Sequence, residues 1–231
     1  MLTRTVRYGT SFGMNEILTR KPAISDEGVT PNTPTPREQE VLSAVLDLMV
    51  EEGDGFSMSS VARRASCSKE TLYRWYGDRD GLLTATVRWQ ASKVFMPELP
   101  AEQVSLKVFS NILCEFAQSW LTVLTGDVSI ALNRLAVSHA GNGKTSLGRI
   151  VLENGPLAMR DRLTPILEMG IQNGFIETTV EEAFRLFFGL VVGDTQIRVL
   201  LGEEEKPEEQ KIQGFAREAV RKFLKICEKS S

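Results

Sequence analysis

The chain has 231 residues, of which 42% are hydrophobic and 25% are charged, an ordinary composition for a globular protein. The formal net charge of −3 excludes an overall attraction to nucleic acid, so a DNA-binding function would require a locally positive surface. Three widely spaced cysteines argue against a disulfide framework, and there is neither a signal-peptide core nor an apolar run long enough to cross a membrane. We therefore expect a cytoplasmic protein.

Residues 1–35 are expected to form an extended or disordered tail. Three prolines fall between Val29 and Pro36, and the segment has no helical periodicity. The tail also carries cationic residues that could touch a DNA groove, as N-terminal arms do in some DNA-binding families: Arg4, Arg7, Arg20 and Lys21. The alternative is a leader without such a role, and Met14 could be the true start.

The first predicted helix begins at Pro36. Thr35 as N-cap and Glu38 three residues later have the spacing of a capping box, and proline is favoured in the first helical turn. An apolar stripe then runs from Val41 to Met49, and the pattern ends in a glycine-rich turn at 53–55. We expect Phe56, just after this turn, to be the aromatic anchor beneath the helices that follow.

Residues 57–76 predict two short helices separated by a tight turn. Apolar residues recur at helical spacing from Met58 to Ala65, with Arg63 and Arg64 on the opposite side. A Ser-Cys-Ser sequence interrupts this pattern, and its last serine is a good N-cap for a helix from Lys69 to Tyr76. A helix, a tight turn and a second helix are typical of a DNA-reading motif.

In this region the sequence resembles the TetR/AcrR family of bacterial transcriptional regulators. The resemblance rests on Val61-Ala62, Ala65-Ser66-Cys67-Ser68, Thr71-Leu72-Tyr73, Trp75-Tyr76, Arg79 and Leu82-Leu83, all in the family's register. Ser66 stands where the family usually has glycine, at a turn that favours a positive φ, so we expect a small strain cost or a shifted turn. Cys67 replaces a small apolar residue of similar size. Glu70 replaces a small or neutral residue, and its carboxylate should weaken non-specific attraction to phosphates.

The resemblance implies an all-α fold with about nine helices. Residues 36–83 would form a three-helix DNA-binding domain with its helix-turn-helix motif at Ser57 to Tyr76, and residues 84–231 a helical regulatory and dimerisation domain. The resemblance also implies a division of roles: Lys69, Glu70 and Arg74 would meet bases, Ser68, Thr71, Tyr73 and Trp75 would hold phosphates or the groove wall, and Arg79 would bind phosphate. The alternative for Tyr73, Trp75 and Tyr76 is that they are core aromatics.

The chain beyond the motif predicts longer helices. The first runs from Arg79 to Met96 and is closed by Pro97 and Pro100. Further helices are expected at 109–124, 128–140, 144–153, 157–173, 180–201 and 212–227. The helix at 180–201 is apolar on nearly every side, and a helix without a polar face must be buried all round.

The last two predicted helices are expected to form a homodimer interface. One small domain cannot easily cover both apolar stripes, so they would meet a second copy in a four-helix arrangement, as the family resemblance also implies. Candidate interface residues are Phe184, Phe188, Val191, Phe215, Ala219 and Phe223. Two reading helices about 34 Å apart would fit successive major grooves of a near-palindromic site. The alternative is that the helix at 180–201 is only the core of a monomer.

A sensor cavity is expected among the helices between the motif and residue 201. Candidate lining residues that suit an apolar or aromatic small molecule are Trp89, Phe116, Trp120, His139 and Met159, although each could instead be a core residue. His139 is the only histidine, so a histidine metal site or a histidine-dependent triad is hard to build, and we expect no metal and no cofactor. A bound effector would move the helix that starts at Arg79 until the paired readers no longer fit the grooves.

Two patterns point towards other functions, and both are weak. Gly143-Lys144-Thr145 resembles the end of a phosphate-binding loop, but the full pattern requires glycine where Ser138 stands and a strand before it. Asp78 and Asp80 are the nearest approach to an acidic catalytic cluster. We therefore predict a ligand-responsive repressor of an operator, and not an enzyme. The alternative is an all-helical small-molecule-binding or adaptor protein without operator binding.

Overall fold

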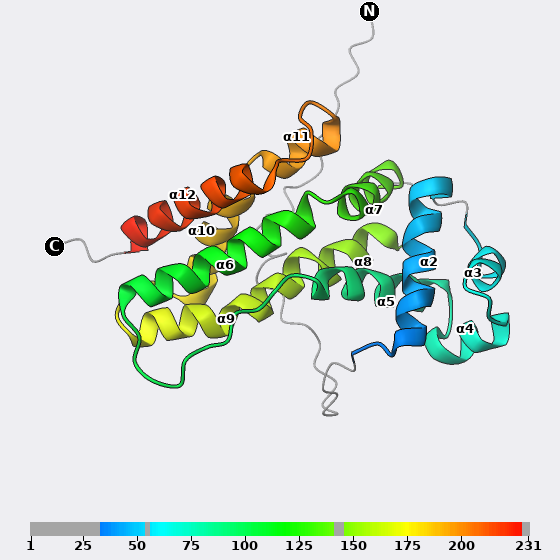
Figure 1. The fold of residues 1–231 in the computed structure, drawn as a ribbon, viewed down its shortest axis with the longest axis horizontal. Helices are drawn as coiled ribbons and strands as arrows, with labels where there is room; N and C mark the ends of the chain where they lie inside the picture. Colours follow the sequence, from blue (N-terminus) through cyan, green and yellow to red (C-terminus); the bar gives the residue numbers. More distant parts are fainter. Residues whose placement is uncertain (1–32, 54–55, 141–145, 228–231) are drawn as a thin grey trace, which may run out of the picture. The chain divides into compact units, whose positions relative to one another are not determined.

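A computed structural model describes residues 33–53, 56–140 and 146–227, and these residues form helices joined by loops, with no strand among them. In chain order the helices are α2 (Pro36–Glu52), α3 (Met58–Arg64), α4 (Lys69–Tyr76), α5 (Arg79–Ser92), α6 (Leu106–Leu124), α7 (Asp127–Ser138), α8 (Leu147–Asn154), α9 (Pro156–Gln172), α10 (Val180–Val192), α11 (Thr195–Leu201) and α12 (Glu209–Cys227) (Figure 1). The all-α prediction is confirmed. The predictions for the tail up to residue 32 and for the Gly-Lys-Thr sequence at 143–145 lie outside the described residues.

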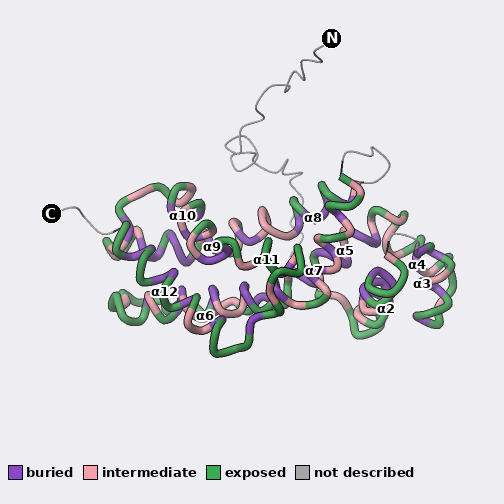
Figure 2. Tube along the Cα trace, turned by 90° about the horizontal axis from the view of Figure 1, so that it is seen from above, coloured by how far each residue is buried: buried purple, intermediate pink, exposed green. Residues whose placement is uncertain are grey.

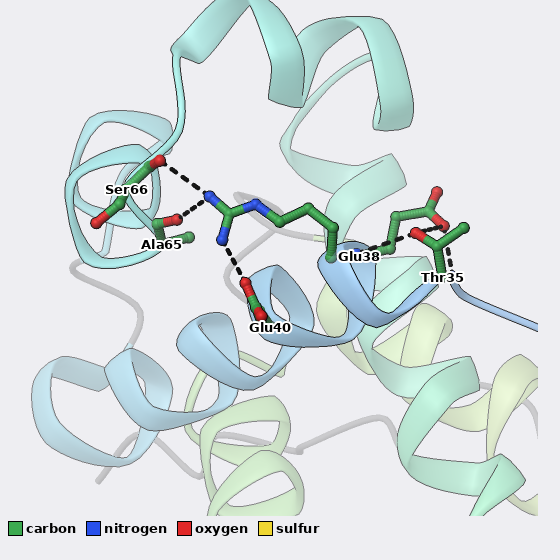
Figure 3. A network of polar contacts seen from close by, with 6 residues as sticks. Thr35, Glu38, Glu40, Ala65 and Ser66 are labelled. Atoms are coloured by element: carbon green, nitrogen blue, oxygen red, sulfur yellow. Dashed lines mark hydrogen bonds and ion pairs between the residues drawn. The ribbon is translucent and has the colours of Figure 1, made fainter.

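Helix α2 begins with the predicted capping box. The backbone N–H of Glu38 donates to Thr35 Oγ1 at 3.3 Å, and the backbone N–H of Thr35 donates to Glu38 Oε2 at 2.8 Å (Figure 3). These two bonds satisfy donors that the first turn of a helix would otherwise leave unpaired. The helix ends at Gly53, whose φ of 64° lies in the left-handed region that glycine enters without strain.

The two helices of the predicted motif start at serine caps. Ser57 caps α3 and exchanges hydrogen bonds with Ser60, whose backbone N–H donates to Ser57 Oγ at 3.1 Å. Ser68 caps α4 by accepting from the backbone N–H of Thr71 at 3.1 Å. Helix α4 ends at Gly77 with a φ of 77°. The predicted bounds of α4, Lys69 to Tyr76, are confirmed.

The turn between α3 and α4 has a left-handed residue where the resemblance led us to expect glycine. Ser66 has a φ of 48°, the only positive φ of a non-glycine residue in the described part of the chain. The Arg37 guanidinium holds this turn: its Nη2 donates to the carbonyl oxygens of Ala65 at 2.6 Å and Ser66 at 2.9 Å, while Nη1 pairs with Glu40 (Figure 3). Arg37 of α2 therefore fixes a conformation that an L-residue adopts only at a cost.

One hydrophobic core extends from the motif into the helices beyond it. Phe56, which is 3% exposed, lies in this core together with Val61 of α3 and Leu72 of α4. The same buried cluster continues through α5, α7 and α8 with Leu82, Leu83, Val87, Leu132, Ala136, Leu147, Ile150 and Val151. Figure 2 shows buried residues along α2, α5, α7 and α8. The helices that would read DNA therefore share their packing with helices of the predicted regulatory region.

Helix α5 ends at Ser92, four residues before the predicted end at Met96. Arg162 of α9 explains the early stop, because its Nη1 donates to the carbonyl oxygen of Ala91 at 2.7 Å and its Nη2 donates to that of Val94. A guanidinium thus takes carbonyl groups that another helical turn would have paired. Half-burial lowers the pKa of Arg162, which still carries its charge at neutral pH.

The predicted single helix at 180–201 is wrong in two respects. It breaks at Gly193, where φ is 49°, and α11 starts after Asp194, whose Oδ2 accepts from Arg198 Nε at 2.6 Å. It is also not apolar all round, because Glu182, Arg185 and Gly189 are exposed on α10. The short α11 instead turns back to α7, where Arg134 donates to the carbonyl oxygens of Val199 and Leu200, both at 2.9 Å.

The remaining helices form a second core. Helix α12 runs beside α6 and α10 (Figure 1). The rings of Phe187 and Phe223 meet edge-on, with centroids 5.2 Å apart, and Phe109 of α6 stacks on Phe175 at 5.4 Å. The first contact joins the last helix to α10, and the second joins α6 to the segment after α9, all within one protomer.

Replacing Ser66 with glycine should raise the free energy of unfolding by about 0.5–1 kcal/mol. Relief of roughly 1–2 kcal/mol of left-handed strain outweighs the ~0.5–1 kcal/mol of extra backbone entropy that glycine loses on folding. Urea unfolding at a fixed protein concentration measures the change. Ser66→Ala is the control, since it keeps the strain, and equal stability of the two variants would contradict this explanation.

Candidate nucleic-acid interface and small-molecule cavity

Helix α4 presents a polar outer side with mixed charge. Lys69, Glu70 and Arg74 are exposed, and Tyr73 is 51% exposed, whereas Leu72 is fully buried. Positions 69, 70, 73 and 74 share one side of a helix, so these four side chains form a common surface. Ser68, just before this helix, is exposed as well, so five of the candidate residues have the access that contact with a DNA groove requires.

The N-terminus of α4 is already occupied by a carboxylate of the chain. The pKa of Glu70 is lowered, first by a hydrogen bond from its own backbone N–H and then by one from the Ser68 hydroxyl. Ser68 Oγ also lies 3.1 Å from Thr71 Oγ1. Free N–H groups at a helix N-terminus attract phosphate, and here the ionised Glu70 competes for them.

The remaining motif side chains lie closer to the core. Trp75 and Tyr76 are half-buried, pack against the core cluster and meet edge-on with ring centroids 6.1 Å apart. Burial raises the pKa of the Tyr76 hydroxyl. Arg79 is half-buried, with its guanidinium carbon 4.6 Å from the centre of the Phe56 ring, a cation–π contact at the first residue of α5. Trp75 and Arg79 therefore combine packing with partial access to solvent.

The basic side chains of α3 differ in their partners. Arg64 donates to Glu51 of α2 through Nη1 at 3.1 Å and through Nη2, which ties α3 to α2. Its neighbour Arg63 is exposed. The chain is negatively charged overall, but the exposed Arg63, Lys69 and Arg74 place positive charge at the motif.

A cavity lies among the helices α5 to α11. Its volume is ≈ 70 Å³, several times the ~10–15 Å³ that one water molecule needs. Its lining residues are mostly apolar and include no ionisable side chain among those the structure describes: Val87, Gln90, Ala91, Val94, Trp120, Val123, Leu124, Ser129, Leu132, Asn133, Val151, Gly155, Pro156, Met159, Phe188 and Gln196. Such a cavity suits a small uncharged molecule with apolar surface.

The five predicted cavity residues fall in different places. Trp120 and Met159 line the cavity. Phe116 is a fully buried core residue, and Trp89 lies outside the cavity with Lys93 Nζ 4.2 Å from its ring centre. His139 is the C-cap of α7, with Nδ1 2.9 Å from the carbonyl oxygen of Leu135. Periodicity marks all five as inward-facing or nearly so, but it does not distinguish a cavity wall from a filled core.

The predicted interface residues also fall into different environments, some buried within the protomer and others lining the cavity or exposed. Phe184, Val191, Ala219 and Phe223 are at most 4% exposed within a single protomer, so they support α10 and α12 from inside. Phe188 lines the cavity and lies 5.6 Å from Trp120 between ring centroids, and Phe215 is 38% exposed. Contact between copies would therefore involve the outer sides of these helices.

Several residues of these sites were not predicted from the sequence. Arg37 and Arg162 act on carbonyl groups far along the chain, and no local pattern identifies their partners. Gln90 had a visible signal, because it continues the buried stripe of α5 that Leu83 and Val87 begin. Across the described residues there is no group of three possible metal ligands, and none of their helices is long and apolar enough to cross a membrane.

Comparisons with known proteins agree with this arrangement. Residues 111–226 match the family model described as the C-terminal domain of an AefR-like transcriptional repressor. A TetR transcriptional regulator from Agrobacterium tumefaciens has 41% sequence identity and a TM-score of 0.73, over 84% of this chain and 95% of that one. The flavonoid-responsive regulator FrrA has 25% identity and a TM-score of 0.64, over 84% and 98%.

A TetR-family regulator from Mesorhizobium loti shares the fold at 21% identity and a TM-score of 0.65, over 82% and 96% of the two chains. No curated protein matches the sequence. The match to the family model and the Agrobacterium relative together establish a ligand-responsive DNA-binding regulator, which acts by binding and not by catalysis. The chain belongs to the TetR family of transcriptional regulators.

Proposed function

We propose that the protein is a homodimeric repressor that leaves its operator when a small apolar or aromatic molecule enters the cavity. One observation carries the proposal: the cavity-lining residues Val87, Leu132 and Val151 belong to the same buried cluster as Val61 and Leu72 beneath the reading helices. Because packed cores transmit strain, a ligand that displaces these walls also displaces the support of α3 and α4. The FrrA relative, named as flavonoid-responsive, and the repressor description of the matching family model favour this reading.

In this proposal, residues 36–83 read DNA and residues 84–231 bind the effector and the second copy. Lys69, Glu70 and Arg74 meet base edges, because they share the outer side of α4. Ser68, Thr71, Tyr73, Trp75 and Arg79 contact phosphates or the groove wall. Tyr73 has the exposure for such a contact, whereas Ser68 and Thr71 also cap their own helix. As a regulator of transcription, the protein would act in the cytoplasm.

The dimer is proposed to form through the outer sides of α10 and α12. Leu186 and Leu190 of α10 are half-buried in one protomer, and Phe215 is exposed on α12, which packs against α10. A Cβ added at Gly189 or Gly214 would meet no atom within 4 Å, so the backbone is open to close approach by another helix. Two copies joined here would present two α4 helices to successive major grooves, about 34 Å apart.

Selection of bound sequences from a random DNA pool tests this proposal. The wild-type protein should select a near-palindromic site, and Lys69→Ala should change the bases selected within each half-site. Arg79→Ala should weaken binding to all sequences about equally and reduce the slope of log affinity against log salt by about 1. An equal loss across sequences for both variants would contradict these roles, and recovery of no enriched sequence would contradict operator binding.

Glu70→Gln should strengthen binding to random duplex DNA roughly fivefold at low salt. The substitution removes a negative charge near phosphates, and repulsion between exposed charges of the same sign is strongest when little salt screens it. Fluorescence anisotropy with labelled duplex measures the change. Glu182→Gln is a matched control, because that carboxylate likewise accepts hydrogen bonds at the N-terminus of a helix, α10. Equal effects of the two substitutions would show that Glu70 does not face DNA.

Phe215→Glu should weaken the dimer at least tenfold, because an unpaired carboxylate in an apolar contact costs more than the ~1–3 kcal/mol of an unpaired neutral polar group, and ~1.4 kcal/mol already corresponds to tenfold. Sedimentation velocity over a range of concentrations measures the monomer–dimer equilibrium. Val137→Glu is the control, since Val137 is 69% exposed on α7, outside the proposed interface. If Phe215→Glu dimerised like the control, the outer side of α12 would not be the interface.

A further inference from the structure

Gln90 is a buried polar residue whose hydrogen bonding is incomplete. It is 9% exposed on α5, and its Nε2 donates to Ser129 Oγ of α7 at 3.2 Å. Its Oε1 is buried and has no hydrogen-bond partner among the described residues. Buried amide oxygens nearly always accept a hydrogen bond, and an unsatisfied one at a functional site indicates a missing partner.

The unpaired oxygen belongs to a residue that lines the effector cavity. Gln90 and Ser129 both border the cavity, and Trp120, Phe188 and Met159 contribute apolar surface to it. The side chain of Trp120 is itself fixed by aromatic neighbours, with Phe116 at 5.7 Å and Phe184 at 6.5 Å between ring centroids. The cavity therefore has rigid apolar walls and is bordered by a residue whose buried amide oxygen has no hydrogen-bond partner among the described residues.

The cavity also selects against charge. None of its described lining residues is an acid or a base, so an ionised ligand would lose its hydration without gaining a counter-ion. The nearby Arg162 does not supply one, because its guanidinium is engaged with the carbonyl groups of Ala91 and Val94.

We propose that the effector is an uncharged aromatic compound with a hydroxyl group, and that this hydroxyl donates its hydrogen to Oε1 of Gln90 while the rings pack against Trp120 and Phe188. This inference rests on the proposed function, in which the effector occupies this cavity. It goes further by naming the polar group of the ligand and the atom that recognises it. A ligand lacking that group leaves the buried oxygen unpaired and binds more weakly.

The proposed hydrogen bond between the ligand and Gln90 also connects ligand binding to helix α5. Gln90 connects α5 to α7 through Ser129, and two residues earlier Arg88 Nε donates to Asn154 Oδ1 of α8 at 2.7 Å. The other end of α5 follows directly on the Gly77-Asp78 turn that closes the reading helix. A hydroxyl bound at Gln90 thus acts on the helix that joins the cavity to the motif.

Isothermal titration calorimetry of the full chain with matched probes tests the proposal. The probes are 2-naphthol, its methyl ether 2-methoxynaphthalene, which cannot donate, and the charged 2-naphthoate. In the wild-type protein 2-naphthol should bind tightest and 2-naphthoate weakest. The ratio of the ether's Kd to the naphthol's Kd should fall about tenfold in Gln90→Met, which removes the acceptor at similar volume.

Gln196→Met is the matched control, because it removes another glutamine from the cavity wall and should leave that ratio unchanged. Gln90→Asn gives a second variant that withdraws the amide by one methylene, and it should also lose most of the preference. The wild-type ratio needs no variant, so the test does not depend on their folding.

Equal affinities of the naphthol and the ether in the wild-type protein would overturn this inference alone. An unchanged ratio in both folded Gln90 variants would do the same. Failure of all three probes to bind would overturn both this inference and the proposed aromatic effector, while operator selection would still decide DNA binding separately.

Discussion

Helix α5 is held at both ends, and this constraint connects the two halves of the molecule. At its start the Asp78 side chain accepts from the backbone N–H of Gly81 at 2.7 Å, and at its end Arg162 binds the carbonyl groups of Ala91 and Val94. Between these anchors, buried leucines of α5 pack under the motif and Gln90 borders the cavity. A helix fixed in this way moves as a rigid body, so a displacement of one end also displaces the other.

The exposed side of α4 carries both positive and negative side chains, which act in opposite directions on DNA phosphates. Lys69 and Arg74 favour phosphate, whereas Glu70 places a negative charge at the helix terminus where phosphate would bind. Non-specific affinity is mostly electrostatic, while base contacts discriminate among sequences. A regulator with this charge pattern gives up affinity for arbitrary DNA and so depends more on contacts that distinguish its operator.

The sequence predicted best those features that depend on neighbouring residues. Caps such as Thr35 and Ser68 act over three residues, and they located α2 and α4 accurately. The end of α5 depends on Arg162, which lies far along the chain, and the break at Gly193 was hidden because apolar residues continue on both sides of it.

Periodicity placed side chains inside the molecule without saying what they meet there. Phe184 and Phe223 were assigned to a surface between copies, yet both are buried by the protomer itself. Trp120 and Phe116 share one stripe of α6, but only Trp120 borders empty space. A cavity forms where the side chains of several helices together do not fill the space between them. The apolar pattern of one helix does not show how much of that space the other helices fill.

Because the cavity and the motif share one core, operator binding must also affect the affinity for the effector. If occupation of the cavity lowers affinity for the operator by some factor, the operator must lower affinity for the effector by the same factor. Effector affinity measured on the free protein would then overstate the protein's sensitivity on DNA. The concentration at which genes respond would be set by the DNA-bound form, in which Val87, Leu132 and Val151 belong to the same packed core as the reading helices.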